Sequence, residues 1–162
     1  MNSPRSQWPL LIVALLLFAG AGWWWIRGRS GNGDRVYFYD LSAKKLFTVP
    51  RTTVPPIPGI EGPEMDGVRA VVISTNGNPK DPSARRVAYL EMYSPELKQQ
   101  MEAAQAGGPP PAMGRAAAQD QRFVRRVDSP QWYPMSSPEA EQIVGEWLTA
   151  GPGGGPALIC NP

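Results

Sequence analysis

The chain has 162 residues, enough for a membrane anchor and one domain but not for a second large hydrophobic core. It contains no His and a single Cys, Cys160. This composition excludes a catalytic pair of His with Ser or Cys, an intrachain disulfide and a Cys-based zinc site. We therefore predict no catalytic residue, no cofactor and no metal site.

The formal net charge is +2, and it is unevenly distributed. Arg5, Arg27 and Arg29 flank the hydrophobic segment, so residues from Ser30 onward carry 13 of the 16 Lys and Arg and all 14 Asp and Glu. Nucleic-acid binding requires clustered positive charge, so no nucleic-acid partner is expected. The 17 Gly and 19 Pro indicate much loop and extended structure.

After an N-terminal tail (residues 1–9), residues 10–26 read LLIVALLLFAGAGWWWI and contain no charge. As a helix this segment is about 25 Å long, at the short end of what crosses a bilayer. Trp23, Trp24 and Trp25 form an aromatic belt suited to the headgroup region, and Arg27 ends the segment. We predict a single transmembrane anchor with the lipid bilayer as its partner.

Two features of this anchor stay open. Ala19–Gly20–Ala21 also resembles a signal-peptide cleavage site, and cleavage near Ala21 would release a secreted soluble binding domain. Arg27, Arg29 and Arg35 outnumber Arg5, which favours a cytoplasmic domain, whereas the short basic start followed by an apolar run favours export. We choose a single-pass protein of the cell membrane with its domain on the non-cytoplasmic side.

The following segments have the composition of a flexible spacer and a β-sheet. Residues 27–34 form the spacer, and residues 35–49 predict a β-hairpin rich in aromatic residues. The Pro-rich residues 50–63 predict an extended loop, because proline cannot donate to a sheet ladder. Residues 68–74 and 86–93 predict two further strands, the first of them central.

The C-terminal half combines two helices with short strands. Ser94–Pro95–Glu96 and Ser137–Pro138–Glu139 each supply an N-cap, a proline for the first turn and an acidic residue near the helix dipole. The first helix is expected over residues 95–106. In the second, Ile143, Val144, Trp147 and Leu148 are expected to share one face. Residues 107–121 predict a mobile insertion, and residues 123–127 and 157–160 predict strands.

The sum is an α+β fold for residues 35–160: an antiparallel sheet of four or five strands with two short helices on one face. Five stretches together resemble a family of short bacterial proteins with a single-span anchor and a Tyr-x-Tyr-Asp-Leu hairpin motif: residues 37–47, 67–70, 89–96, 132–134 and 137–139. That family has no assigned function, so the resemblance implies an architecture and no activity.

Two readings of function follow. Aromatic residues carry much of the binding energy at interfaces, and Tyr37, Tyr39, Trp132 and Tyr133 are candidates for an interaction surface. We therefore expect a membrane-tethered, non-enzymatic interaction or accessory protein with a protein partner, in an envelope assembly. The alternative is a hydrolase that uses carboxylates alone, which requires two carboxyl groups close together in a cleft with raised pKa values.

Overall fold

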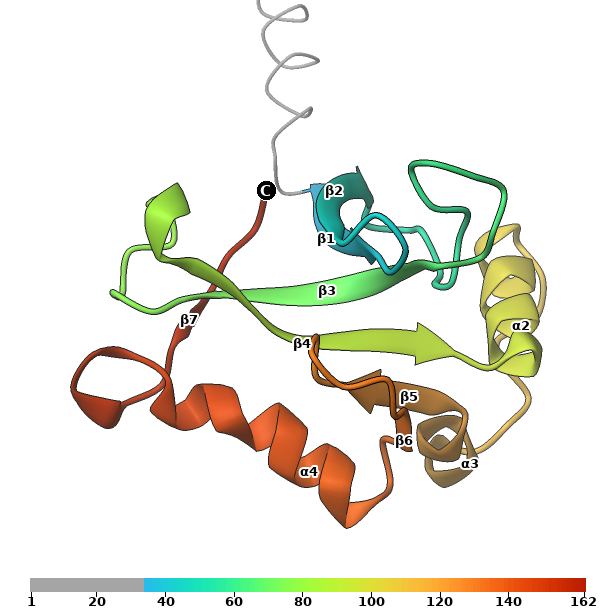
Figure 1. Ribbon diagram of the computed structural model, residues 1–162. Helices are drawn as coiled ribbons and strands as arrows, with labels where there is room; N and C mark the ends of the chain where they lie inside the picture. Colours follow the sequence, from blue (N-terminus) through green and yellow to red (C-terminus); the bar gives the residue numbers. More distant parts are fainter. Residues whose placement is uncertain (1–33) are drawn as a thin grey trace, which may run out of the picture. The chain divides into compact units, whose positions relative to one another are not determined.

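The structure, a computed structural model, describes residues 34–162 (Figure 1). The predicted tail at residues 1–9, the anchor at residues 10–26 and nearly all of the spacer lie outside the described residues, as do Trp23, Trp24, Trp25 and Arg27. Among the helices of residues 34–162, none has the length and apolar character needed to cross a membrane.

The described residues form one antiparallel sheet with a few short helices, which confirms the α+β class. The strand order is β2-β1-β3-β4-β5-β6, with β7 also paired to β3. The strands are β1 (Arg35–Asp40), β2 (Lys45–Pro50), β3 (Gly67–Ser74), β4 (Arg85–Tyr93), β5 (Arg122–Arg125), β6 (Tyr133–Pro134) and β7 (Leu158–Ile159). The sheet has more strands than the predicted four or five, and the two-residue strand β6 is the one that lies outside every segment predicted as a strand.

The predicted hairpin of residues 35–49 is confirmed as β1 and β2. Phe38 pairs with Phe47, and the centroids of the two rings lie 6.0 Å apart. This aromatic pair joins the two strands of the hairpin, and Phe38 itself is fully buried. Lys44, at φ 55°, completes the turn.

The predicted central strand is β3, and two strands, β1 and β7, pair with one of its edges. β1 pairs with the start of β3, from Gly67 to Arg69. β7 pairs with its end, where the Cys160 N–H donates to the carbonyl oxygen of Val72 at 2.8 Å. The other edge pairs with β4 along most of its length. The prediction of a last strand within residues 157–160 is thus confirmed.

Alternation along the strands gives the sheet two distinct faces. One face buries Val68, Ala70, Val72, Leu90 and Cys160, which we call the central cluster or, after its largest member, the Leu90 cluster. A register shift between Val71 and Val72 inserts one extra residue in β4 opposite them. The sheet therefore keeps its small apolar residues on one side across the irregularity.

Both predicted helix starts are confirmed. In α2 (Pro95–Gln105) the Ser94 Oγ accepts a hydrogen bond from the backbone N–H of Leu97 at 3.1 Å. In α4 (Pro138–Gly145) the Ser137 Oγ accepts one from the N–H of Ala140 at 3.2 Å. Each cap satisfies one of the N–H groups that a helix start leaves unpaired.

The two helices pack on the same face of the sheet, as predicted. Ile143 of α4 is buried against Tyr89 and Val124, and we call these residues together with Ala140 the Ile143 cluster. Leu97 of α2 is buried against Tyr93. Tyr89 and Tyr93 lie on one side of β4, opposite Leu90. We call this side the helix-covered face; α4 runs along β4 and β5 in Figure 1.

The second helix is shorter than its apolar pattern predicts. α4 ends at Gly145 and a 3-10 helix, η3 (Glu146–Thr149), follows. Trp147 is partly buried beside the Ile143 cluster, but Leu148 is 49% exposed, so the prediction that Leu148 shares the buried face is wrong. The tighter 3-10 winding changes the direction of the side chains after Gly145.

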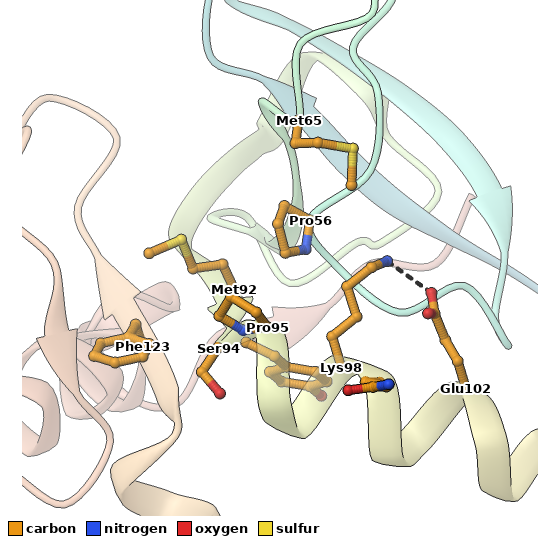
Figure 2. Close-up of a pocket in the computed structure, with 10 residues that line it drawn as sticks. Pro56, Met65, Met92, Ser94, Pro95, Lys98, Glu102 and Phe123 are labelled. Carbon is orange, nitrogen blue, oxygen red and sulfur yellow. Dashed lines mark ion pairs between the residues drawn. The ribbon is translucent and has the colours of Figure 1, made fainter.

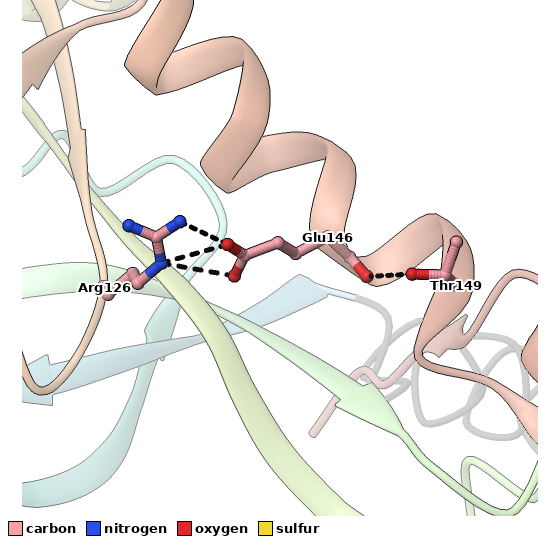
Figure 3. Close-up of polar contacts among 3 residues, drawn as sticks. All are labelled: Arg126, Glu146 and Thr149. Atoms are coloured by element: carbon pink, nitrogen blue, oxygen red, sulfur yellow. Dashed lines mark hydrogen bonds and ion pairs between the residues drawn. The ribbon is translucent and has the colours of Figure 1, made fainter.

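An ion pair fixes this change of winding to the sheet. The Arg126 Nε lies 3.0 and 3.3 Å from the two carboxylate oxygens of Glu146, and the Arg126 Nη2 also contacts Glu146 (Figure 3). The Glu146 carbonyl oxygen accepts a hydrogen bond from the Thr149 hydroxyl. The contact joins the end of β5 to η3 directly after α4.

The predicted insertion at residues 107–121 contains a short helix, α3 (Arg115–Asp120). Three consecutive alanines have high helix propensity, and Gly114 stands at the N-cap. The Asp120 carboxylate accepts a hydrogen bond from the Ser136 hydroxyl, which fastens the end of α3 near β6. Part of this segment is therefore ordered structure that leads into β5.

Truncation of the helix-covered core gives a test of this packing. We expect Ile143→Ala to lower the free energy of unfolding by about 2–5 kcal/mol, because it leaves a cavity beneath α4. The matched variant Leu148→Ala, at an exposed position, should change it by less than about 0.5 kcal/mol. Urea unfolding of the full chain in neutral detergent, followed by circular dichroism, measures both; equal losses would contradict the packing described.

Candidate functional site

The structure brings together three of the four aromatic residues predicted to form an interaction surface. Tyr37 and Tyr39 of β1 and Trp132, directly before β6, all pack against the Leu90 cluster and are partly exposed. Tyr133 lies apart from them, against the Ile143 cluster on the helix-covered face. Neighbouring residues in a strand point to opposite faces, which separates Trp132 from Tyr133.

We call the side that carries Tyr37, Tyr39, Arg125 and Trp132 the aromatic face. Within residues 34–162, the side chains packed against its central cluster come from strands and loops, and none comes from α2, α3 or α4. The aromatic side chains therefore cover the apolar centre of this face themselves, and their outer surfaces meet solvent.

Aromatic side chains from distant strands border one apolar cluster on the aromatic face. Tyr39 belongs to β1 and Trp132 lies next to β6, with β3, β4 and β5 between them in the sheet. Both contact the same cluster in β3 and β4. Tyr39 also lies close enough to Arg125 of β5 to act on its pKa electrostatically.

Arg125 is the most unusual charged group of this face. Its guanidinium lies over the Trp132 ring, 4.9 Å from the ring centroid, in a cation–π contact. Its Nε is buried and has no hydrogen-bond partner. Burial lowers the pKa of Arg125, and proximity to Tyr39 opposes this shift. The face thus holds a partly desolvated positive charge against an aromatic ring.

Arg85 forms hydrogen bonds with neighbouring residues at the other end of the aromatic face. Its Nη1 donates to the Tyr37 hydroxyl at 2.8 Å and its Nη2 to the carbonyl oxygen of Pro79 at 3.1 Å. Burial raises the pKa of the neighbouring Cys160 thiol, which the positive charge of Arg85 partly offsets. Because a thiol with a raised pKa stays protonated near pH 7, Cys160 serves here as an apolar core residue.

An apolar groove of about 720 Å³ adjoins the aromatic face (Figure 2). Met92 and Phe123, paired across β4 and β5, line it together with Pro56, Met65 and Pro95. Met92 also packs against the Leu90 cluster, so the groove continues from the aromatic face toward α2. Its volume lies in the range of ligand-binding pockets.

Lys98 of α2 forms polar contacts at the edge of this groove. The Lys98 Nζ lies 2.7 Å from a Glu102 oxygen and donates to the carbonyl oxygen of Val54 at 2.8 Å. Sequence reasoning did not find the groove. Alternation in β4 could have placed Met92 beside Leu90, but no pattern shows that Pro56 and Met65, from a distant loop, lie opposite α2.

Carboxylates gather in a separate cavity of about 320 Å³ beside the hairpin turn: Asp40, Glu61, Glu64 and Asp66. Asp40 is buried and accepts hydrogen bonds from the backbone N–H groups of Ala43 and Ile60, both at 2.6 Å. These bonds lower the pKa of Asp40, the Ala43 bond most, and burial opposes them. Asp40 therefore joins the hairpin turn to the Pro-rich loop as an ionised acceptor.

This cavity does not have the electrostatics of a carboxylate hydrolase. A general acid near neutral pH needs a raised pKa, whereas the pKa of Asp40 is lowered. The Ser42 hydroxyl donates to Asp66, and Glu61 pairs with Lys45 at 3.0 Å. Within residues 34–162, no group of three or more Cys, Asp or Glu side chains is arranged to hold a metal ion.

Comparison of the chain with models of protein families, with curated proteins and with solved structures found no match. The resemblance to the family of short anchored bacterial proteins stays a prediction.

The environment of Asp40 predicts a pH-dependent stability. Because the pKa of Asp40 is lower in the folded state, its contribution to stability is complete above the unfolded value of about 3.9 and is lost as the pH falls through the folded value. Asp40→Asn should destabilise the protein at pH 7, and its difference from the parent chain should shrink below about pH 4.

The control for this experiment is Glu64→Gln, at an exposed position around the same cavity. Thermal unfolding of the full chain between pH 3 and pH 7 should show little effect of this change. A stability difference between Asp40→Asn and the parent chain that is constant over this range would contradict the role given to the Asp40 carboxylate.

Proposed function

We propose that this chain is a membrane-tethered, non-enzymatic interaction protein, anchored through residues 10–26, that binds a protein partner through its aromatic face. In this proposal the domain lies on the non-cytoplasmic side and serves as an accessory component of an envelope assembly. The prediction of the anchor rests on the uncharged sequence of residues 10–26 and on the three indole rings near its C-terminal end.

The observation that carries the proposal is the gathering of Tyr37, Tyr39 and Trp132 on a sheet face that no described helix covers. Large aromatic side chains with part of their surface in solvent are enriched among residues that dominate binding energy. Arg125 adds a positive charge that is attracted to the Trp132 ring and belongs to a partly exposed side chain. Aromatic residues and arginine are the side chains most enriched at protein interfaces.

The alternative of a carboxylate-based hydrolase has less support. The carboxylates of the cavity beside the hairpin turn are paired or held by backbone N–H groups. The chain also contains no His that could exchange protons near pH 7.

Site-specific photo-cross-linking tests the proposed binding face. With p-benzoylphenylalanine in place of Tyr39, illumination of membranes holding the full chain should yield one adduct of defined mass with another protein. The adduct should weaken at least tenfold when Trp132→Ala is added, because that change removes a central aromatic contact.

The matched control places the same photoreactive residue at Gln142, which is exposed on α4 of the helix-covered face. No equivalent adduct is expected there. If both positions gave the same adducts, or if position 39 cross-linked only to this chain, the proposed binding face would be wrong. Determining the N-terminal residue of the mature protein tests whether the anchor is retained, because a start just after Ala21 would show a secreted domain instead.

A further inference from the structure

The acidic residues of the strands lie on one face of the sheet, whereas basic residues lie on both. Both acidic residues of the strands, Asp40 and Glu91, lie on the helix-covered face, as alternation from Phe38 and Tyr89 requires. Arg35, Arg85 and Arg125 lie on the aromatic face, in line with Tyr37, Val87 and Phe123. The strands thus give the aromatic face positive charge only.

Two arginines at the helix-covered side have carboxylate partners. Arg122 lies 3.5 Å from Glu91, which is buried, and Arg126 pairs with Glu146 in η3. The arginines of the aromatic face have different contacts. Arg35 donates to Thr48, and Arg85 donates to Tyr37 and to a backbone carbonyl oxygen. Arg125 contacts the Trp132 ring and forms no ion pair within residues 34–162.

The Arg125 guanidinium therefore has unused capacity to bind an anion. Its Nε is buried without an acceptor, and two N–H donors of a guanidinium can bind a carboxylate in a bidentate geometry. A partly desolvated charge attracts an opposite charge more strongly than a fully hydrated one does. A carboxylate that approaches over Trp132 would gain this interaction while the cation–π contact is kept.

The apolar groove lies within the same strands as Arg125. Phe123 lines the groove and is two residues before Arg125 in β5, so their side chains leave the same face about 7 Å apart along the strand. Alternate residues of an extended peptide have the same spacing. A peptide that runs along β5 can therefore place one side chain at Arg125 and the next residue of the same face in the groove.

We infer that the aromatic face and the groove together bind an extended acidic peptide segment of a partner protein, with a carboxylate at Arg125 and an apolar side chain between Met92 and Phe123. The inference rests on the proposed function and specifies the chemistry of the partner. Charge complementarity with Arg35, Arg85 and Arg125 selects acidic residues, and the Met-lined groove accepts apolar side chains of different shapes.

The groove beside Arg125 favours a peptide over an anionic membrane surface. Its lining by Pro56, Met65, Met92 and Phe123 is apolar, whereas a lipid surface presents charged headgroups. An extended peptide offers a carboxylate and an apolar side chain two residues apart on one face. The bilayer is nevertheless the second source of negative charge that the experiment has to distinguish.

The test uses the full chain in nanodiscs of phosphatidylcholine and a short fluorescein-labelled peptide in which a glutamate and a phenylalanine lie two positions apart, with serine between them, so that both side chains share one face of the extended chain. Fluorescence anisotropy should show binding of this peptide, and a version with lysine in place of glutamate should not bind. Replacing its phenylalanine with serine should weaken binding about tenfold, because the groove would then stay empty. This change is made in the peptide and leaves the protein intact.

Variants of the protein test whether Arg125 is the charged residue that binds the peptide. Arg125→Gln should weaken binding by about tenfold or more, Arg125→Lys should restore part of it, and Arg86→Gln, at an exposed site on the helix-covered face, should have no effect. Equal losses for Arg125→Gln and Arg86→Gln would overturn the assignment to Arg125. Circular dichroism checks that each variant is folded.

The remaining outcomes separate this inference from the proposed function. If position 39 still cross-links to a partner while neither peptide binds, or both bind equally, the acidic specificity is overturned and the interaction protein stands. If both the adduct and the peptide affinity are absent, both are overturned. Protection of β1 and β5 from hydrogen exchange by nanodiscs with added phosphatidylglycerol, without peptide affinity, would overturn the inference in favour of a lipid surface.

Discussion

The structure depends on the backbone pairing of β3. This strand pairs with β4 on one edge and with both β1 and β7 on the other, so it joins the N-terminal hairpin to the C-terminal residues of the chain. A slip of one residue would move Val68, Ala70 and Val72 to the opposite face and separate them from Leu90. One extra residue in β4 opposite Val71 and Val72 forms a bulge, and the pairing of β3 with β4 is regular on both sides of it.

The register of β3 divides the sheet into two faces with different chemistry. The helix-covered face is a conventional core, in which Ile143 and Leu97 pack on tyrosines and the buried Glu91 has an arginine partner. The aromatic face covers its own apolar centre with large side chains and keeps Arg125 without a carboxylate. A partly buried charge without a carboxylate partner costs stability, which supports a role in binding for this face.

Local patterns predicted much of the fold. The capping residues Ser94 and Ser137 marked both helix starts, and runs of aromatic and β-branched residues marked β1 to β4. Patterns failed where a contact outside the segment decided the structure. Leu148 is exposed because η3 replaces the α-helical winding, and the Arg126–Glu146 ion pair that accompanies this change joins residues twenty positions apart.

The sequence by itself determined the anchor hypothesis, the α+β class and the aromatic character of the candidate surface, because these depend on composition and on periods of two or 3.6 residues. Only the tertiary structure decided that Tyr39 and Trp132 share a face, that Tyr133 does not, and that the groove continues from them. Strand order sets this placement, and it arises from backbone pairing between residues far apart in the chain, which no local pattern encodes.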